Sequence, residues 1–125
     1  MSDAWLRLLL ILIAATTVVS GAAQLLAPDF VLSFIAKDKS PLTLQFFATV
    51  GMFMVITGAM FLQSLWKRSS ETAISLWIGV QKAAAAALVA WAIMRGLLLP
   101  IAYVVAGFDA LTAVLTFIFW HRLRR

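Results

Sequence analysis

Four long apolar stretches, separated by short polar segments, constrain this chain more than any other feature. A helix needs about 20 mostly apolar residues to cross a hydrocarbon core about 30 Å thick. Lipid offers no hydrogen-bond partners, so only a helix satisfies its own backbone in such a single segment. We therefore predict an all-α membrane protein, with four transmembrane helices in an antiparallel bundle.

The predicted spans end where charged or helix-breaking residues interrupt the apolar runs. Their expected bounds are residues 4–27, 44–66, 72–94 and 98–120. The interruptions are Pro28-Asp29, Lys67 through Ser70, Arg95-Gly96 and the basic segment that begins at His121. No linker divides the chain, so residues 1–125 are expected to form one transmembrane domain.

The composition agrees with a lipid environment. Of 125 residues 64% are hydrophobic and 12% are charged, whereas soluble domains are about half apolar and about a quarter charged. A small domain has too little interior to bury this excess. The net charge of +5 comes mainly from basic residues that flank the spans, so we expect contact with the bilayer and none with nucleic acid.

The first span also resembles a secretory signal peptide. Arg7, the apolar run and the small residues Ser20 to Ala23 fit that template. The chain carries this segment from Met1, and we expect it to be retained as a membrane anchor.

The lysines and arginines that flank the spans predict the orientation. Six lie on one side of the predicted bundle and three on the other, and the richer side is expected to face the cytoplasm. Both termini are then cytoplasmic, in a bacterial-type inner membrane. The six are Arg7, Lys67, Arg68, Arg122, Arg124 and Arg125, and the three are Lys37, Lys39 and Arg95.

The connection between the first two spans is too apolar for a solvated loop. Phe30, Leu32 and Phe34 lie between Pro28-Asp29 and Lys37. We expect a short helix over about residues 29–36 that lies in the membrane interface.

Small residues recur on one face of three spans, where they let helices approach closely. The short connections around residues 67–71 and 95–97 predict that the second and third spans, and the third and fourth, are antiparallel neighbours. The faces are Gly51 and Gly58 in the second span, Ser75, Gly79, Lys82 and Ala86 in the third, and Ala102, Ala106, Asp109 and Ala113 in the fourth.

Lys82 and Asp109 are the sharpest chemical feature. Each lies about midway along its span, and the hairpin between them turns near Arg95-Gly96, so they are expected at the same depth. A charge at the centre of a membrane helix costs about 2.5–3.5 kcal/mol, so each residue needs a partner. The pair is either a structural contact that fixes helix register or a functional, proton-linked or ligand-binding pair. A third alternative is poor alignment, with Lys82 facing water or another subunit.

Further polar residues lie near this pair. Gln81 adjoins Lys82, and Gln24 lies with Thr17 on a mildly polar face of the first span, so both are binding candidates. Together with Thr49, these polar residues are consistent with a shallow cavity that opens toward the outer side of the membrane. The alternative is that the hydroxyls bond their own helix backbone.

No cofactor or metal site is predicted. The chain has no cysteine, which excludes disulfides, thiolate-bound zinc and iron–sulfur clusters. His121 is the only histidine and lies among arginines, so a haem held by two histidines cannot form within one chain. The methionines are expected to serve packing rather than copper binding.

Three segments resemble the small four-helix membrane proteins grouped as DoxX-like, many of which have no known function. These segments are Gly21 to Pro28, Gly51-Met-Phe-Met-Val-Ile-Thr-Gly58, and Gly107-Phe-Asp-Ala-Leu111. The resemblance implies a four-helix fold and permits a role as an accessory subunit of a membrane oxidoreductase. Lys82 is not part of it.

Two functions therefore compete. The short loops and small-residue faces favour a non-enzymatic accessory or scaffold subunit, as a homo-oligomer or with other membrane subunits. The alternative is a small transporter or a proton- or ion-linked carrier that uses Lys82 and Asp109. An enzyme is not expected, because no nucleophilic, acidic or His-rich constellation is present.

Overall fold

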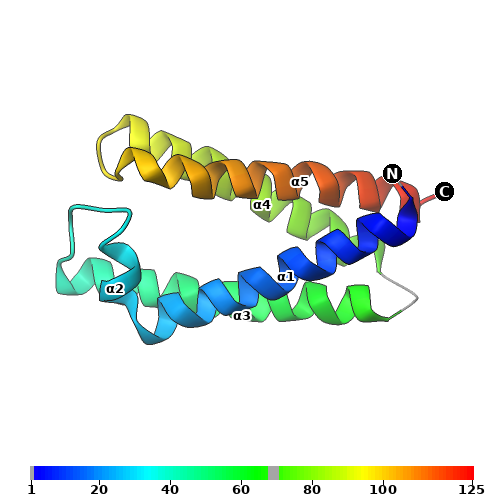
Figure 1. Cartoon of the computed structure of the whole chain (residues 1–125), viewed down its shortest axis with the longest axis horizontal. Coiled ribbons are helices and arrows are strands. Elements are labelled where there is room, and N and C mark those ends of the chain that lie inside the picture. The colour runs from blue at the N-terminus through cyan, green and yellow to red at the C-terminus, as the bar shows by residue number, and fades with distance from the viewer. Residues whose placement is uncertain (1, 68–70) are drawn as a thin grey trace.

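The computed structural model describes residues 2–67 and 71–125, which form helices running back and forth along one axis (Figure 1). The long helices are α1 (Asp3–Leu26), α3 (Pro41–Trp66), α4 (Thr72–Met94) and α5 (Tyr103–Leu123). The short helix α2 (Pro28–Leu32) follows α1, and the 3-10 turn η1 (Pro100–Ala102) precedes α5. Within these described residues, four helices, with η1 joined to α5, are long and apolar enough to cross a membrane. The predicted all-α fold is thus confirmed, and the chain is a small multi-pass membrane protein.

Side-chain caps determine where two of the long helices begin. Ser2 Oγ accepts a hydrogen bond from the backbone N–H of Trp5 at 3.2 Å, and α1 starts at the next residue, Asp3. Ser40 Oγ likewise accepts from the N–H of Thr43 at 3.3 Å. Because Pro41 suits the first helical position, α3 begins there rather than at the expected residue 44.

The turn between α4 and α5 delays the start of the last helix. Gly96 has φ 76°, a left-handed conformation that glycine adopts at helix ends, and α4 stops just before it. Leu98 then pairs with Ala36 in an antiparallel bridge. The chain is therefore extended at residue 98, where a helix was predicted, and α5 continues to Leu123 rather than ending at residue 120. Arg68, Ser69 and Ser70, at the predicted end of the second span, lie outside the described residues.

The long helices form two pairs, α1 with α3 and α4 with α5 (Figure 1). A Cβ added to Gly51 would lie 2.7 Å from the backbone oxygen of Gly21, so the backbones of α1 and α3 touch directly. In the other pair, the side-chain ring of Phe117 on α5 packs against Gly79 of α4. The short connection makes α3 and α4 antiparallel, but they make few contacts, because the glycines of each one receive a different helix.

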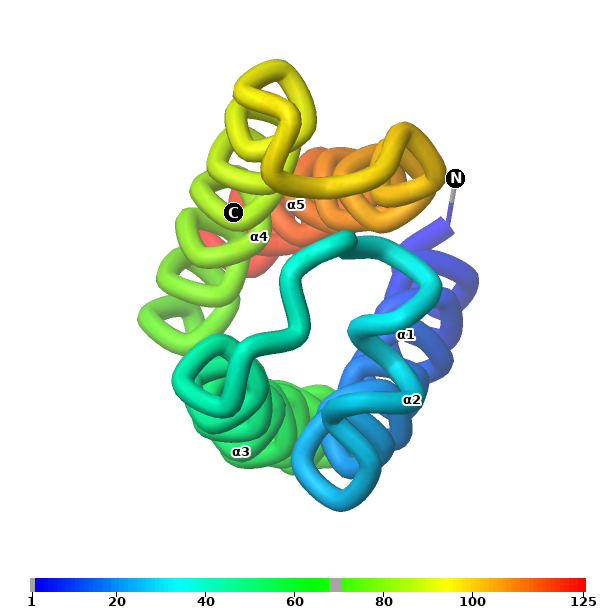
Figure 2. The backbone as a smooth tube through the Cα atoms, turned by 90° about the vertical axis from the view of Figure 1, so that its left-hand side faces the viewer, coloured from blue at the N-terminus to red at the C-terminus, as the bar shows by residue number. Residues whose placement is uncertain are grey.

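The apolar core lies at the end of the bundle that carries both termini, here called the terminal half; the end with α2 and η1 is the loop half. All four long helices surround one axis (Figure 2) and contribute to this core. Its buried members are Leu6, Leu10, Ala14, Phe61, Leu65, Ile78 and Phe119. Many large apolar side chains outside this core face outward, as lipid contact requires; Leu26, for example, is 82% exposed.

Helix α2 covers part of the loop half. Leu32 is buried, whereas Phe30 and Phe34 are exposed and their rings meet edge to face at 5.1 Å. Lys39 Nζ lies 3.0 Å from Asp29 Oδ1, which closes the connection to α3. The helix ends at Leu32, short of the expected residue 36, but the exposed rings of Phe30 and of Phe34 just after it agree with a position in the membrane interface.

Candidate functional site

Lys82 lies on the one face of α4 that is buried. Ser75, Ile78, Gly79 and Lys82 recur at helical spacing, and all four are buried. The side chain of Lys82 is 10% exposed and that of Asp109 13%. A burial of this degree removes most of the water from both charged groups, so their direct contacts dominate their energy.

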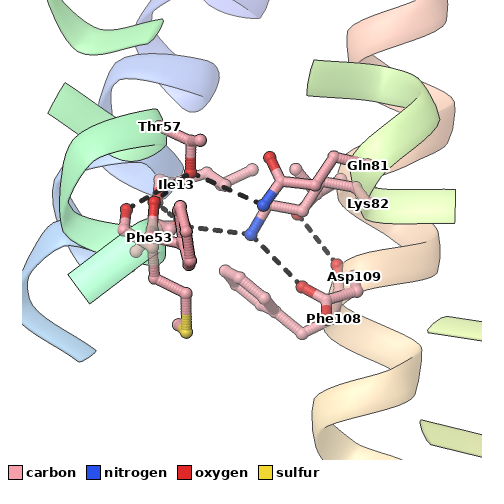
Figure 3. Close-up of polar contacts among 10 residues, drawn as sticks. Ile13, Phe53, Thr57, Gln81, Lys82, Phe108 and Asp109 are labelled. Carbon is pink, nitrogen blue, oxygen red and sulfur yellow. Dashed lines mark hydrogen bonds and ion pairs between the residues drawn. The ribbon is translucent and has the colours of Figure 1, made fainter. Parts of the chain in front are cut away.

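The ammonium of Lys82 connects three helices (Figure 3). Lys82 Nζ donates to Asp109 Oδ1 of α5 at 3.3 Å and to Thr17 Oγ1 of α1 at 3.2 Å. Both distances exceed the 2.7–2.9 Å or so that is usual for a strong charge-assisted hydrogen bond. The pair thus joins α4 to its partner α5 and, across the two helix pairs, to α1.

Thr17 is oriented to receive this charge. Its hydroxyl donates to the carbonyl oxygen of Ile13 at 3.0 Å, so its lone pairs remain for the ammonium. An ammonium has three N–H donors, and Thr17 and Asp109 use two of them. The Phe108 ring, with its centroid 6.0 Å from Nζ, lies at the outer limit of a cation–π contact.

Gln81 extends the polar contacts to the remaining long helix. Its Nε2 donates to Thr57 Oγ1 of α3 at 3.5 Å, and Thr57 in turn donates to the carbonyl of Phe53 at 2.8 Å. Adjacent residues of α4 therefore reach α1, α3 and α5 at the same level. Figure 3 shows the two side chains side by side, with Gln81 directed at Thr57 and Lys82 at Asp109.

Gln24 does not join this cluster. It lies seven residues beyond Thr17 on α1, about 10 Å along the helix. Its Nε2 donates to the carbonyl of Phe47 at 2.9 Å, and the residue is 8% exposed. Gln24 therefore holds α1 against α3, and of the four candidates Lys82, Asp109 and Gln81 come together.

A small cavity lies beside the Lys82 ammonium. Its volume open to the centre of a water molecule is about 10 Å³, which is close to the minimum for one water. Polar and apolar groups line it, so a water there would find hydrogen-bond partners. The lining residues are Ile13, Ala14, Thr17, Thr57, Gly58, Phe61, Ile78, Gln81, Lys82 and Thr112.

Two buried hydroxyls lie deeper in the terminal half. Ser75 and Thr116 are fully buried, and neither side-chain oxygen has a hydrogen-bond partner among the described residues. Ser75 precedes Lys82 by seven residues and Thr116 follows Asp109 by seven, so the antiparallel helices place both about 10 Å from the ion pair. Sequence reasoning treated Ser75 as a small residue and missed Thr116; the matching spacing is the signal that identifies them.

The threonine hydroxyls mostly bond the backbone of their own helices, which was one of the two predicted alternatives. Thr49 donates to the carbonyl of Gln45 at 3.0 Å, and Thr112 to that of Phe108 at 2.8 Å. The cavity described above lies at the centre of the bundle rather than at its outer end, where we predicted an opening. Its lining residues Thr57 and Thr112 were not predicted.

The remaining sequence candidates lie apart from this cluster. His121 is exposed near the end of α5. Among residues 2–67 and 71–125, no three His, Asp or Glu side chains gather as they do around a metal ion. Comparison of the chain with family models, with curated proteins and with solved structures finds no match.

Proposed function

We propose that this chain is a non-enzymatic accessory or scaffold subunit of a membrane assembly. The observation that carries the proposal is the use of the central charges: Lys82 is bonded to Asp109 and to Thr17, and so connects the two helix pairs. A contact of this kind fixes helix register and resists separation of the pairs. The adjoining cavity has room for about one water, which favours a structural role over passage of a solute through one chain.

Small residues on the surface support an assembly. Ala83, Ala84 and Ala87 of α4 are exposed, and a Cβ added to Gly107 of α5 would meet no atom within 4 Å. Exposed small residues let another helix approach closely within lipid. The partner is a second copy of the chain or another membrane subunit. The resemblance to DoxX-like proteins permits the second of these, an accessory role beside a membrane oxidoreductase.

The mass of the complex in mild detergent tests the scaffold proposal. The chain alone is 13.7 kDa. We expect a larger complex with a fixed stoichiometry, which Gly107→Leu disrupts without unfolding the chain. The matched control is Leu111→Phe on the same helix, where a large exposed residue is already present. A monomer with no companion polypeptide would contradict the proposal.

We propose a cytoplasmic location for both termini, supported by the six-to-three count of basic residues. The chain has no cysteine, so a single introduced cysteine reports its own accessibility. In sealed right-side-out vesicles of a bacterial inner membrane, a maleimide that cannot cross membranes should label Lys37→Cys and not Ser2→Cys. The opposite labelling would reverse the orientation.

The second candidate function is a proton-linked carrier, and the polar interior favours it. Lys82 has one N–H that neither Thr17 nor Asp109 uses, beside a cavity of about one water. Ser75 and Thr116 add two buried hydroxyls without partners among the described residues. Such groups can pass a proton through ordered water, and membrane-buried charges often serve this purpose.

Neutral variants separate the two functions. Lys82→Met or Asp109→Asn alone should destabilise the bundle by about 3–5 kcal/mol, because each leaves one buried charge without its partner. The double variant should restore stability. If the double variant also stays in its assembly and shows the same proton flux in liposomes as the original chain, the Lys82–Asp109 pair is structural. If the original chain shows a proton flux that the double variant loses, the carrier function is favoured.

The exposed pair Asp29–Lys39 supplies the control for this experiment. Its nitrogen–oxygen distance of 3.0 Å resembles that of the central pair, but both side chains are exposed. Asp29→Asn with Lys39→Met changes the same residue types outside the interior. We expect little change in stability, because exposed ion pairs contribute about 0–1 kcal/mol.

A further inference from the structure

A shallow, open groove runs along the outer side of α5 to the end of the helix. It has a volume of about 530 Å³ and is lined by Val114, Phe117, Ile118, His121, Arg122 and Arg125. The five positions from 114 to 122 recur at spacings of three and four residues, so they form a single stripe on α5, and Arg125 follows just past the end of the helix at Leu123. The stripe is apolar in its first half and basic in its second half, toward the terminal end of the bundle.

The apolar half has the composition to contact an acyl chain. Val114 is 56% exposed and Ile118 41% exposed, so both present apolar surface outward. The Phe117 ring lies against α4, because Gly79 has no side chain to keep it away; an added Cβ would lie 2.8 Å from the ring. The groove therefore has an apolar wall where it lies inside the predicted span.

The basic half has the charge to hold a phosphate. Arg122 donates to Asp3 Oδ1 at 2.9 Å and is thereby held at the groove, with its side chain 23% exposed. His121 and Arg125 are exposed beside it. Asp3 balances the charge of Arg122, whereas Arg125 adds a further positive charge at this end of the helix, beside His121. This local charge favours the binding of an anion.

The length of the stripe matches one leaflet of a bilayer. Residues 114 to 122 extend over about 12 Å of α5, and Arg125 lies just beyond the end of the helix. Half of a hydrocarbon core is about 15 Å. A phospholipid has its apolar and anionic parts separated over the same distance. A soluble anion would not need the apolar half, and a partner helix would not need the basic half.

We infer that this groove binds one anionic phospholipid, with its phosphate at His121, Arg122 and Arg125 and an acyl chain along Val114, Phe117 and Ile118. The inference is independent of the proposed function. It concerns the outer side of α5, whereas the Lys82 pair lies in the interior. The lipid would hold the end of α5 at the membrane surface.

Native mass spectrometry of the purified full chain tests this inference. The chain is offered equal amounts of phosphatidylglycerol and phosphatidylcholine with identical acyl chains. We expect one retained phosphatidylglycerol, bound at least about fivefold more tightly than phosphatidylcholine, since a basic residue near a membrane surface contributes about a factor of five. Equal retention of the two lipids would overturn the inference.

Two neighbouring arginines provide a matched comparison. Arg125→Gln should weaken phosphatidylglycerol binding about fivefold. Arg124→Gln removes the same charge one residue away, but Arg124 lies off the stripe, with its guanidinium 4.7 Å from the centre of the Trp120 ring. It should change binding less than twofold. Equal losses would mean a general surface attraction and would overturn the site.

The apolar half is tested in the same way. Ile118→Gln should lower phosphatidylglycerol retention several-fold, whereas Val104→Gln, at a residue of α5 that is 70% exposed and off the groove, should not. Glycerol phosphate at millimolar concentration should fail to displace the lipid. Displacement by glycerol phosphate would mean that the groove binds free phosphate, and displacement by a soluble acidic peptide would mean a protein partner; either result overturns the inference. Thermal unfolding of each variant in detergent confirms that the fold is retained.

Discussion

In the terminal half of the bundle, apolar side chains from all four long helices meet in one core, whereas in the loop half the two helix pairs are joined through a backbone bridge. Many partial contacts hold the terminal half, so the loss of one methyl group there leaves the others. The loop half depends on a few contacts of defined geometry. Gly21 and Gly51 place α1 against α3, and Leu99 donates its N–H to the carbonyl of Ile35 at 2.7 Å.

Lys82 lies at the boundary between the two halves. Toward the termini α4 buries Ser75, Ile78 and Gly79, and beyond Lys82 it has no further buried residue. The ion pair therefore marks the depth at which four-helix packing ends. This position explains why one ammonium is able to reach side chains of both α1 and α5.

The largest effect is expected from the glycine contact of the loop half. In Gly51→Val, the new Cβ would lie 2.7 Å from Gly21 O and 2.8 Å from Leu25 N, which are backbone atoms that move only if the helices separate. We expect a loss of more than about 3 kcal/mol, above the 1–3 kcal/mol or so that is usual for overpacking, because the clashing atoms belong to the backbone. Denaturant titration in detergent, followed by tryptophan fluorescence, measures it. Ala59→Val is the control, because Ala59 is exposed on the same helix; equal effects of both changes would refute close packing of α1 on α3.

A core truncation tests the terminal half. Leu10 is fully buried, so Leu10→Ala should cost about 2–3 kcal/mol, less than the glycine change, because the surrounding apolar side chains can relax into the space. Leu8→Ala is the matched control on the same helix, since Leu8 is 45% exposed. It should cost under about 1 kcal/mol in the same titration. The comparison of the halves would fail if Leu10→Ala cost more than Gly51→Val.

The backbone bridge of the loop half can be tested by removing one hydrogen-bond donor. Leu99 has φ −72°, which proline also adopts, so Leu99→Pro removes the N–H donor with little change of backbone. We expect a loss of about 1 kcal/mol and faster hydrogen exchange in residues 28–36. Leu99→Ala keeps the donor and should leave exchange unchanged. Unchanged exchange in both variants would show that the bridge does not hold α2 in place.

The smallest effect is expected at the outer edge of the terminal half. Arg122 lies 2.9 Å from Asp3, whose side chain is 76% exposed, so water and salt screen the pair. Asp3→Asn should cost less than about 1 kcal/mol. The loss should shrink as salt is raised from low concentration to about 1 M. A large loss of stability that does not depend on salt would mean that the Arg122–Asp3 pair behaves like the buried Lys82–Asp109 pair.

The sequence by itself determined the four spans, their buried faces and the depth of Lys82 and Asp109. Hydropathy and helical periodicity are local properties, so α4 matches the predicted residues 72–94. Two starts were missed because contacts outside the hydropathy pattern decide them. The side-chain cap of Ser40 sets the start of α3 at Pro41, and the long-range bridge between Leu98 and Ala36 delays α5 to Tyr103.

Only the tertiary structure decided which helices pair and what surrounds the Lys82 ammonium. The choice of α1 rather than α4 as the partner of α3 depends on Gly21 meeting Gly51, two residues far apart in the chain. Thr17 reaches Lys82 because that packing turns its face of α1 inward. A periodic pattern shows which face of a helix is buried, but it does not identify the residue on the neighbouring helix that contacts this face. That contact depends on how closely the helices pack in space and not on the order of residues along the chain.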